Sequence, residues 1–294
     1  MLASLSNLAR RTRCLSSLVS PSWIVSQQSK DDSLIVLNCD HPSEHDRGHI
    51  PAAKPFSQAF SGLKVSGECI SESCLQDVLL KIGYDSSKTL VLYDNRKSLL
   101  SSRAWWILSH YGIPREKLKL LDGGWNHWVA CGNPVETKSE KNISAEKGIL
   151  EKKISGIQLY AGDKLIGLKE IQKLLTEKNG IFIDTRSREE FSGLFLCGNA
   201  RGGHIPGALH LEWIDVIDGE NNDIFKSKEQ LLEDFSELCE IQPYPDATIV
   251  SYCQKGIRAA SVAFMLEEVC GFQNVKVYEN SMQEYLNREG VQAE

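Results

Sequence analysis

Short apolar runs rich in β-branched residues alternate with amphipathic segments along the second half of the chain. The run 180–184 predicts a strand, and residues 169–177 before it have the apolar spacing of a helix. Residues 247–252 predict a fully buried strand, 259–269 return to helical spacing, and 275–278 predict a further strand. Strands that alternate with helices favour a parallel sheet with helices on both faces, so we predict an α/β fold.

The same motifs occur twice in the same order. The matching blocks are 47–53 with 202–208, 90–94 with 248–253, and 121–128 with 278–285. A nearly constant offset between three blocks indicates two diverged copies of one fold. We therefore predict a targeting segment at 1–18, a first domain at 19–136, a Lys/Glu/Ser-rich linker at 137–160 and a second domain at 161–294. Each domain should hold a mostly parallel central sheet flanked by helices.

Composition excludes several classes of protein. With 41% hydrophobic and 24% charged residues in 294, the chain is long enough and apolar enough to bury a core in each copy. It has no apolar run of the length needed to cross a membrane. A net charge of −6 makes nucleic acid a poor partner, so an anionic substrate needs a local pocket. The nine cysteines, an odd number, favour free thiols in a reducing compartment.

The N-terminal segment 1–18 has the composition of a mitochondrial transit peptide. It contains Arg10, Arg11 and Arg13 between leucines and serines, and the first acidic residue is Asp31. We therefore expect the mitochondrial matrix as the location. The alternative is a frayed basic terminus of a cytoplasmic protein.

Candidate chemistry lies in the loop 253–258, between a predicted strand and a predicted helix, where sites form in parallel sheets. A helix N-terminus favours the thiolate of Cys253, and Lys255 and Arg258 add positive charge. Gly256 permits the positive φ that turns loop amides towards an anion. The first copy has Asp94 at the matching position, and a carboxylate cannot attack sulfur. We therefore expect the second copy to be catalytic and the first to be inactive.

Three arginines are candidates for binding an oxyanion of the substrate by charge-assisted hydrogen bonds. Arg186 and Arg188 follow the predicted strand 180–184, and Arg201 precedes the second His-Ile-Pro motif. The alternative is that these arginines pair with nearby carboxylates, namely Asp184, Glu189 or Glu190.

Several motifs together resemble those of the two-domain rhodanese-type sulfurtransferases, which include thiosulfate and 3-mercaptopyruvate sulfurtransferases. The motifs are, in chain order, VSPSW at 19–23, HIP at 49–51, RAWW at 103–106, LDGGW at 121–125, HIPGA at 204–208 and CQKGIR at 253–258. The resemblance covers almost the whole chain after residue 18. It implies two tandem rhodanese folds, of which the C-terminal one carries a persulfide on Cys253.

The resemblance also marks departures from the family pattern. Asp184 and Arg186 match the family's Asp-Ser-Arg element, but Glu190 stands where a second arginine is often found. Arg188 or Arg201 could substitute for that arginine. Arg258 replaces a small hydroxyl residue common at the end of the loop in animal enzymes. Met282 stands where the family has an aromatic residue.

The resemblance implies a ping-pong reaction. Cys253 attacks the outer sulfur of a donor such as thiosulfate, sulfite leaves, and a thiol, thioredoxin or cyanide then removes the sulfur. Neither a metal nor an organic cofactor is required. Lys255 favours thiosulfate as the donor, whereas the neutral Gln254, a supporting residue of the loop, fits neither donor class cleanly; 3-mercaptopyruvate is the alternative.

Two other functions are open to this pattern. Cysteine-based phosphatases and arsenate reductases share the fold but need five residues between cysteine and arginine, and here four separate Cys253 from Arg258. A non-catalytic sulfur carrier remains the third alternative.

Overall fold

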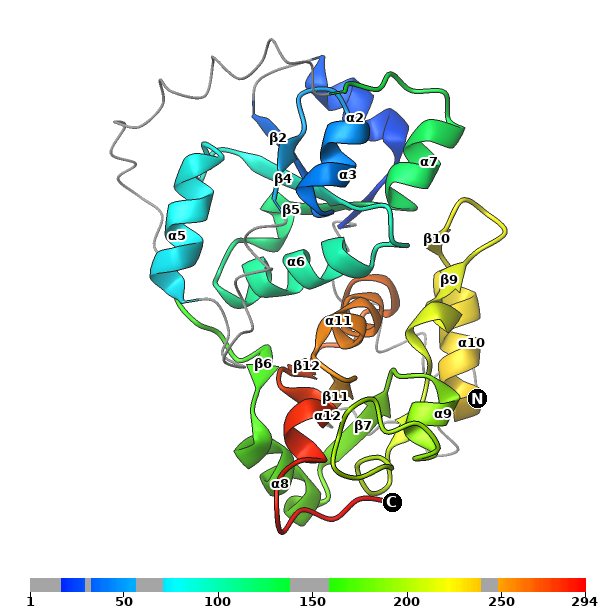
Figure 1. The fold of residues 1–294 in the computed structure, drawn as a ribbon. Coiled ribbons are helices and arrows are strands. Elements are labelled where there is room, and N and C mark those ends of the chain that lie inside the picture. The colour runs from blue at the N-terminus through cyan, green and yellow to red at the C-terminus, as the bar shows by residue number, and fades with distance from the viewer. Residues whose placement is uncertain (1–16, 30–32, 57–70, 138–158, 239–247) are drawn as a thin grey trace. The chain divides into compact units, whose positions relative to one another are not determined.

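The computed structural model describes residues 17–29, 33–56, 71–137, 159–238 and 248–294 (Figure 1). Most of the predicted targeting segment and of the predicted linker lie outside these residues. Two compact units divide the chain. The N-terminal unit comprises Ser17–Gly162 with Glu220–Ile224, and the C-terminal unit comprises Asp163–Gly219 with Phe225–Glu294.

The N-terminal unit contains a five-stranded sheet in which every neighbouring pair is parallel. Its strands are, in spatial order, β1 (Leu18–Val19), β5 (Leu118–Leu121), β4 (Thr89–Tyr93), β2 (Leu34–Asn38) and β3 (Lys54–Pro55). The central strands are mostly apolar because both faces of the sheet are covered.

Helices cover both faces of this sheet. They are α2 (Pro21–Gln28), α3 (Pro42–Arg47), α5 (Glu72–Lys81), α6 (Leu99–His110) and α7 (Gly124–Ala130), with a 3-10 turn at Arg115–Lys117. Ile24 of α2 and Trp128 of α7 share one core cluster with Val91 and Tyr93 of β4. Side chains alternate along a strand, so the remaining residues of β4 point to the opposite face, where α6 packs (Figure 1).

The C-terminal unit repeats this arrangement. Its parallel strands are, in spatial order, β6 (Leu165–Ile166), β12 (Val275–Tyr278), β11 (Thr248–Tyr252), β7 (Gly180–Asp184) and β8 (Leu209–His210). Its helices are α8 (Leu168–Glu177), α9 (Arg188–Phe191), α10 (Lys228–Leu238), α11 (Ile257–Phe264) and α12 (Ser281–Tyr285), with a π-helix at Met265–Cys270. A 3-10 turn at Trp213–Val216 precedes a small two-stranded sheet of β9 (Ile217–Asp218) and β10 (Ile224–Phe225).

The structure confirms the predicted α/β architecture and most of its elements. The predicted strands correspond to β7, β11 and β12, and the predicted first helix corresponds to α8. The helix predicted at 259–269 begins two residues earlier, because Gly256 has φ +76 and α11 starts directly after it. Leu18, which the sequence analysis placed in the targeting segment, lies in β1 and pairs with Leu120 of β5. Among the described residues, no helix is long and apolar enough to cross a membrane.

A buried tyrosine ends the central strand of each copy and holds the His-Ile-Pro segment. The hydroxyl of Tyr252 accepts a hydrogen bond from the Ile205 backbone N–H at 3.2 Å. Tyr93 accepts the equivalent bond from Ile50 at 3.1 Å and a second one from the side-chain amide of Asn38 at 3.0 Å. These equivalent bonds give the structural correspondence between the two copies.

Replacing either tyrosine by phenylalanine should destabilise the protein, because buried N–H donors lose their acceptor. We expect Tyr252→Phe and Tyr93→Phe each to lower the free energy of unfolding by about 1–3 kcal/mol. Urea unfolding of the full chain measures this. The exposed Tyr160→Phe is the control, and equal stability of all three variants would contradict the prediction.

Candidate functional site

Cys253 lies at the carboxyl end of β11, the central strand of the C-terminal sheet. It is a free cysteine and its residue is 1% exposed. Gly256, three residues later, caps α11 in the left-handed conformation that the sequence predicted. The thiol therefore lies one short turn before a helix N-terminus.

The start of α12 fixes the backbone of this loop. The Cys253 N–H donates to Ser281 Oγ at 3.1 Å, and the Cys253 carbonyl accepts from the Met282 N–H at 3.0 Å. The next carbonyl, of Gln254, accepts from the Gln283 N–H at 3.0 Å. Met282 thus contributes its backbone to the site. Its side chain is buried in the core cluster that also contains Tyr278 and Tyr285.

Arg258 forms a two-point ion pair with Glu190. The distances are 2.6 Å from Nη1 to Oε2 and 2.8 Å from Nη2 to Oε1. Burial lowers the pKa of Arg258, but hydrogen bonds to Glu190 and to the Cys253 sulfur outweigh it and raise that pKa above its usual value. Burial also raises the pKa of Glu190, and its bonds to Arg258 more than reverse this and lower it. The guanidinium therefore binds the Glu190 carboxylate and lies close to the Cys253 sulfur.

The two charged departures from the family pattern are thus partners. Glu190 stands where an arginine is expected by resemblance, and Arg258 stands where a small hydroxyl residue is expected. The structure joins them although 68 positions separate them. In this chain, the positive charge of this part of the site is therefore carried by Arg258, at the end of the Cys253 loop.

The Arg186 side chain pairs with Asp184 rather than with Cys253. Its guanidinium donates to both Asp184 oxygens, with Nη2 to Oδ2 at 2.7 Å, and to the Gly203 carbonyl at 2.8 Å. Both residues of the pair are at most 1% exposed. The structure therefore favours the alternative reading of Arg186, in which it pairs with Asp184 rather than binding substrate.

The other two arginine candidates also have structural contacts. Arg201 donates to four backbone carbonyls of the C-terminal segment, those of Tyr285, Leu286, Arg288 and Val291. Arg188 is exposed, and its guanidinium carbon lies 5.9 Å from the centre of the Phe191 ring. Arg201 is thus held by the C-terminal segment, and Arg188 lies at the surface against Phe191.

Gln254 forms a reciprocal amide pair with Asn199. The two side chains exchange hydrogen bonds at 2.9 and 3.0 Å, which fixes Gln254 in a buried position. Lys255, by contrast, is exposed. The thiol of Cys197 also reaches this region, where burial and a hydrogen bond to Glu190 raise its pKa.

Sequence reasoning missed Ser281, Asn199 and Cys197. One signal existed for Ser281, because it aligns with Gly124 of the first copy and both have positive φ, +50 and +52. Asn199 and Cys197 carry no such signal, because a loop far from Gln254 in the sequence brings them into contact.

The first copy shows what its loop does with Asp94 in place of the cysteine. Asp94 Oδ1 accepts from the backbone N–H groups of Arg96 at 2.7 Å and Ser98 at 3.1 Å, and Oδ2 accepts from that of Ser101 at 2.6 Å. The Asp94 carbonyl accepts from the Trp125 N–H, as that of Cys253 does from Met282. The loop amides of this fold therefore converge on an anion at this position.

The comparison with protein families decides the relationship. The model of the rhodanese-like domain matches twice, at residues 20–131 and 167–288. The chain belongs to the rhodanese family. It contains two rhodanese domains, as the internal repeat predicted.

Relatives match this rhodanese over nearly its whole length. A putative thiosulfate sulfurtransferase of Haloferax volcanii is 28% identical over 94% of this chain and 96% of the relative. The thiosulfate sulfurtransferase of Corynebacterium glutamicum is 27% identical over 92% and 87%. The sulfur carrier protein TtuD of Thermus thermophilus is 28% identical over 93% and 95%. These relatives support a sulfurtransferase without distinguishing its sulfur donor.

Solved structures share the fold of this rhodanese. YnjE superposes with a TM-score of 0.79 at 22% identity, over 97% of this chain and 70% of that one. An anaerobic ergothioneine biosynthesis enzyme from Chlorobium limicola also gives 0.79, at 18% identity over 96% and 71%. At these identities the likeness concerns the fold alone.

Breaking the Asp184–Arg186 pair tests its structural role. Asp184→Asn leaves a buried guanidinium without its counter-charge, so we expect a loss of about 3–5 kcal/mol in the free energy of unfolding. Urea unfolding measures it, with the exposed Glu189→Gln as the matched control. If Asp184→Asn is as stable as the control, the pair does not hold the site together.

Proposed function

We propose that this rhodanese is a sulfurtransferase that moves the outer sulfur of thiosulfate to a thiol or to cyanide through a persulfide on Cys253. The observation that carries the proposal is the position of Cys253 at the carboxyl end of β11, one turn before α11, with the Arg258 guanidinium close to its sulfur. A cation beside the sulfur stabilises negative charge both on the thiolate and on the donor.

The reaction is a pair of displacements at sulfur. The Cys253 thiolate attacks the outer sulfur of thiosulfate, the S–S bond of the donor breaks, and sulfite leaves with the bonding pair. The outer sulfur of the resulting persulfide carries the negative charge. An acceptor thiolate or cyanide then attacks that sulfur, and the Cys253 thiolate is restored.

The Asp94 loop supports an amide cradle for the persulfide. Three backbone N–H groups surround the Asp94 carboxylate in the first copy. We infer that the corresponding amides before α11, with Gly256 at its positive φ, stabilise the persulfide anion in the second copy. This contribution is independent of the Arg258 charge.

A donor must displace a side chain to reach Cys253, because the residue is only 1% exposed. Arg258 is the candidate, since its side chain is 23% exposed and held mainly by Glu190. An anionic donor competes with the Glu190 carboxylate for the same guanidinium. We propose that exchange of this partner admits thiosulfate, and that Lys255 attracts it from solvent.

The alternatives keep specific support. 3-Mercaptopyruvate also offers a carboxylate to Arg258, so it remains the second candidate donor. The relative TtuD is named a sulfur carrier protein. This supports the alternative in which Cys253 forms a persulfide without turnover. The mitochondrial location stays a prediction that rests on residues 1–18, and thioredoxin stays one of the proposed acceptors.

Replacing the nucleophile should abolish labelling with sulfur. After incubation with thiosulfate, intact and peptide mass spectrometry should find one added sulfur on Cys253, and Cys253→Ser should carry none. Cys197→Ser is the matched control, because its thiol lies in the same region and should leave the label in place. Label on another cysteine, or label that persists in Cys253→Ser, would refute the assignment.

The Glu190–Arg258 pair should control donor affinity in opposite directions. Arg258→Met should raise the thiosulfate KM by roughly tenfold or more through loss of a charge-assisted bond. Glu190→Gln should lower it, because Arg258 no longer has a competing carboxylate. Steady-state assays with thiosulfate and 3-mercaptopyruvate on each variant measure this. A much higher rate of the wild type with 3-mercaptopyruvate would overturn the choice of donor.

A further inference from the structure

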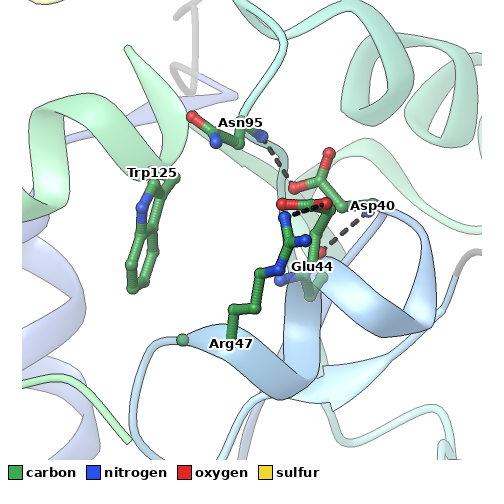
Figure 2. Close-up of a pocket in the computed structure, with 7 residues that line it drawn as sticks. Asp40, Glu44, Arg47, Asn95 and Trp125 are labelled. Atoms are coloured by element: carbon green, nitrogen blue, oxygen red, sulfur yellow. Dashed lines mark hydrogen bonds and ion pairs between the residues drawn. The ribbon is translucent and has the colours of Figure 1, made fainter. Parts of the chain in front are cut away.

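A cavity of about 170 Å³ lies in the N-terminal unit, at the carboxyl ends of β2 and β4. Asp40 and Glu44 lie on one side of it and Trp125 on the other, with Arg47 at its rim (Figure 2). Asn38, Gly48 and Asn95 complete the lining. The predicted catalytic chemistry belongs to the other copy, so this cavity has no part in it.

Asp40 is a buried carboxylate in the wall of this cavity. Its side chain is 3% exposed, and Oδ2 accepts from the Asn95 N–H at 2.8 Å. Oδ1 accepts no hydrogen bond from any residue that the structure describes. Arg96 Nε forms a long ion pair with Oδ1 at 3.9 Å, beyond hydrogen-bonding distance. Burial and the nearby Asp94 raise the pKa of Asp40 to about 6.

The second copy shows what normally occupies this place. Asn38 pairs with Tyr93 as Asp184 pairs with Tyr252, so Asp40 occupies the position of Arg186. By the same repeat, Gly48 occupies the position of Gly203.

In the second copy a guanidinium fills the equivalent space. Arg186 binds the carboxylate of Asp184 and the carbonyl of Gly203 there. In the first copy the shorter Asp40 replaces this arginine and reverses its charge. The cavity therefore includes the space that a guanidinium would fill, and the Asp40 carboxylate lies in its wall.

We propose that this cavity binds a small guanidinium compound. Its N–H groups donate to the Gly48 carbonyl, which corresponds to the Gly203 carbonyl that Arg186 binds, and its charge lies beside the Asp40 and Glu44 carboxylates. The indole of Trp125 gives the cation an aromatic wall. This wall is fixed, because Trp125 stacks on Tyr93 with 6.5 Å between ring centroids and a Cβ on Gly48 would approach its ring to 3.3 Å.

Charge and size restrict the ligand further. Asp40 and Glu44 disfavour an anion, which separates this site from the proposed sulfur donors. Glu44 already holds Arg47 by a 2.8 Å bond between exposed side chains, so it can exchange that guanidinium for another. A volume of about 170 Å³ has room for roughly five or six water-sized groups. Methylguanidine is therefore a suitable probe.

Calorimetric titration of the full chain with methylguanidine tests the site. We expect one binding event per chain, weakened about tenfold or more by Asp40→Asn, which removes the charge and keeps the shape. Asp77→Asn, an exposed change on α5 of the same unit, should leave the affinity unchanged. Tetramethylammonium has the charge but no N–H donor, and should not bind.

A second variant tests the site if Asp40→Asn does not fold. The double change Asn38→Asp with Asp40→Arg rebuilds the carboxylate–guanidinium pair of the second copy, so it should fold and lose methylguanidine binding. Absence of saturable binding to the wild type, or equal affinity in Asp40→Asn, would overturn the proposal. Persulfide labelling of Cys253 on the same samples reports separately on the proposed activity, whose failure would leave this result unaffected.

Discussion

A helix that begins directly after a central parallel strand leaves its first backbone N–H groups without partners in the helix, and something must accept from them. The first copy meets that requirement with the carboxylate of Asp94, which accepts from the N–H groups of Arg96, Ser98 and Ser101. In the second copy Cys253 holds the same position, after the central strand and before α11. The same place in the fold thus holds a carboxylate in one copy and a thiol in the other.

Charge near that sulfur is arranged differently from the family pattern, yet remains balanced. Glu190 and Arg258 are each unusual alone and complementary together, because their two-point pair puts a guanidinium beside Cys253 without leaving a buried charge unpaired. Arg186 is withdrawn into its own pair with Asp184. The positive charge near Cys253 therefore depends on one ion pair between distant parts of the chain.

The sequence was sufficient for features encoded locally. The strands at 180–184 and 275–278, the duplication and the loop around Cys253 follow from periodicity, repeats and a glycine, and the structure contains them. Contacts between distant segments could not be predicted. Arg201 binds carbonyls more than eighty positions away, so nothing near it indicated that its guanidinium is committed. Glu190 and Arg258 were both recognised as departures, but only the fold shows that they meet.

The Asp94 loop differs from the Cys253 loop in more than one feature. A thiol introduced at position 94 would remove the carboxylate that accepts from three backbone N–H groups. It would also lie one residue further from the start of α6 than Cys253 lies from the start of α11. The neighbouring Asp40 would also have to yield its place to an arginine. A cysteine site like that of the second copy would thus require several coordinated changes in the first copy. Each of these changes is unfavourable alone, so single mutations do not readily make the two loops alike.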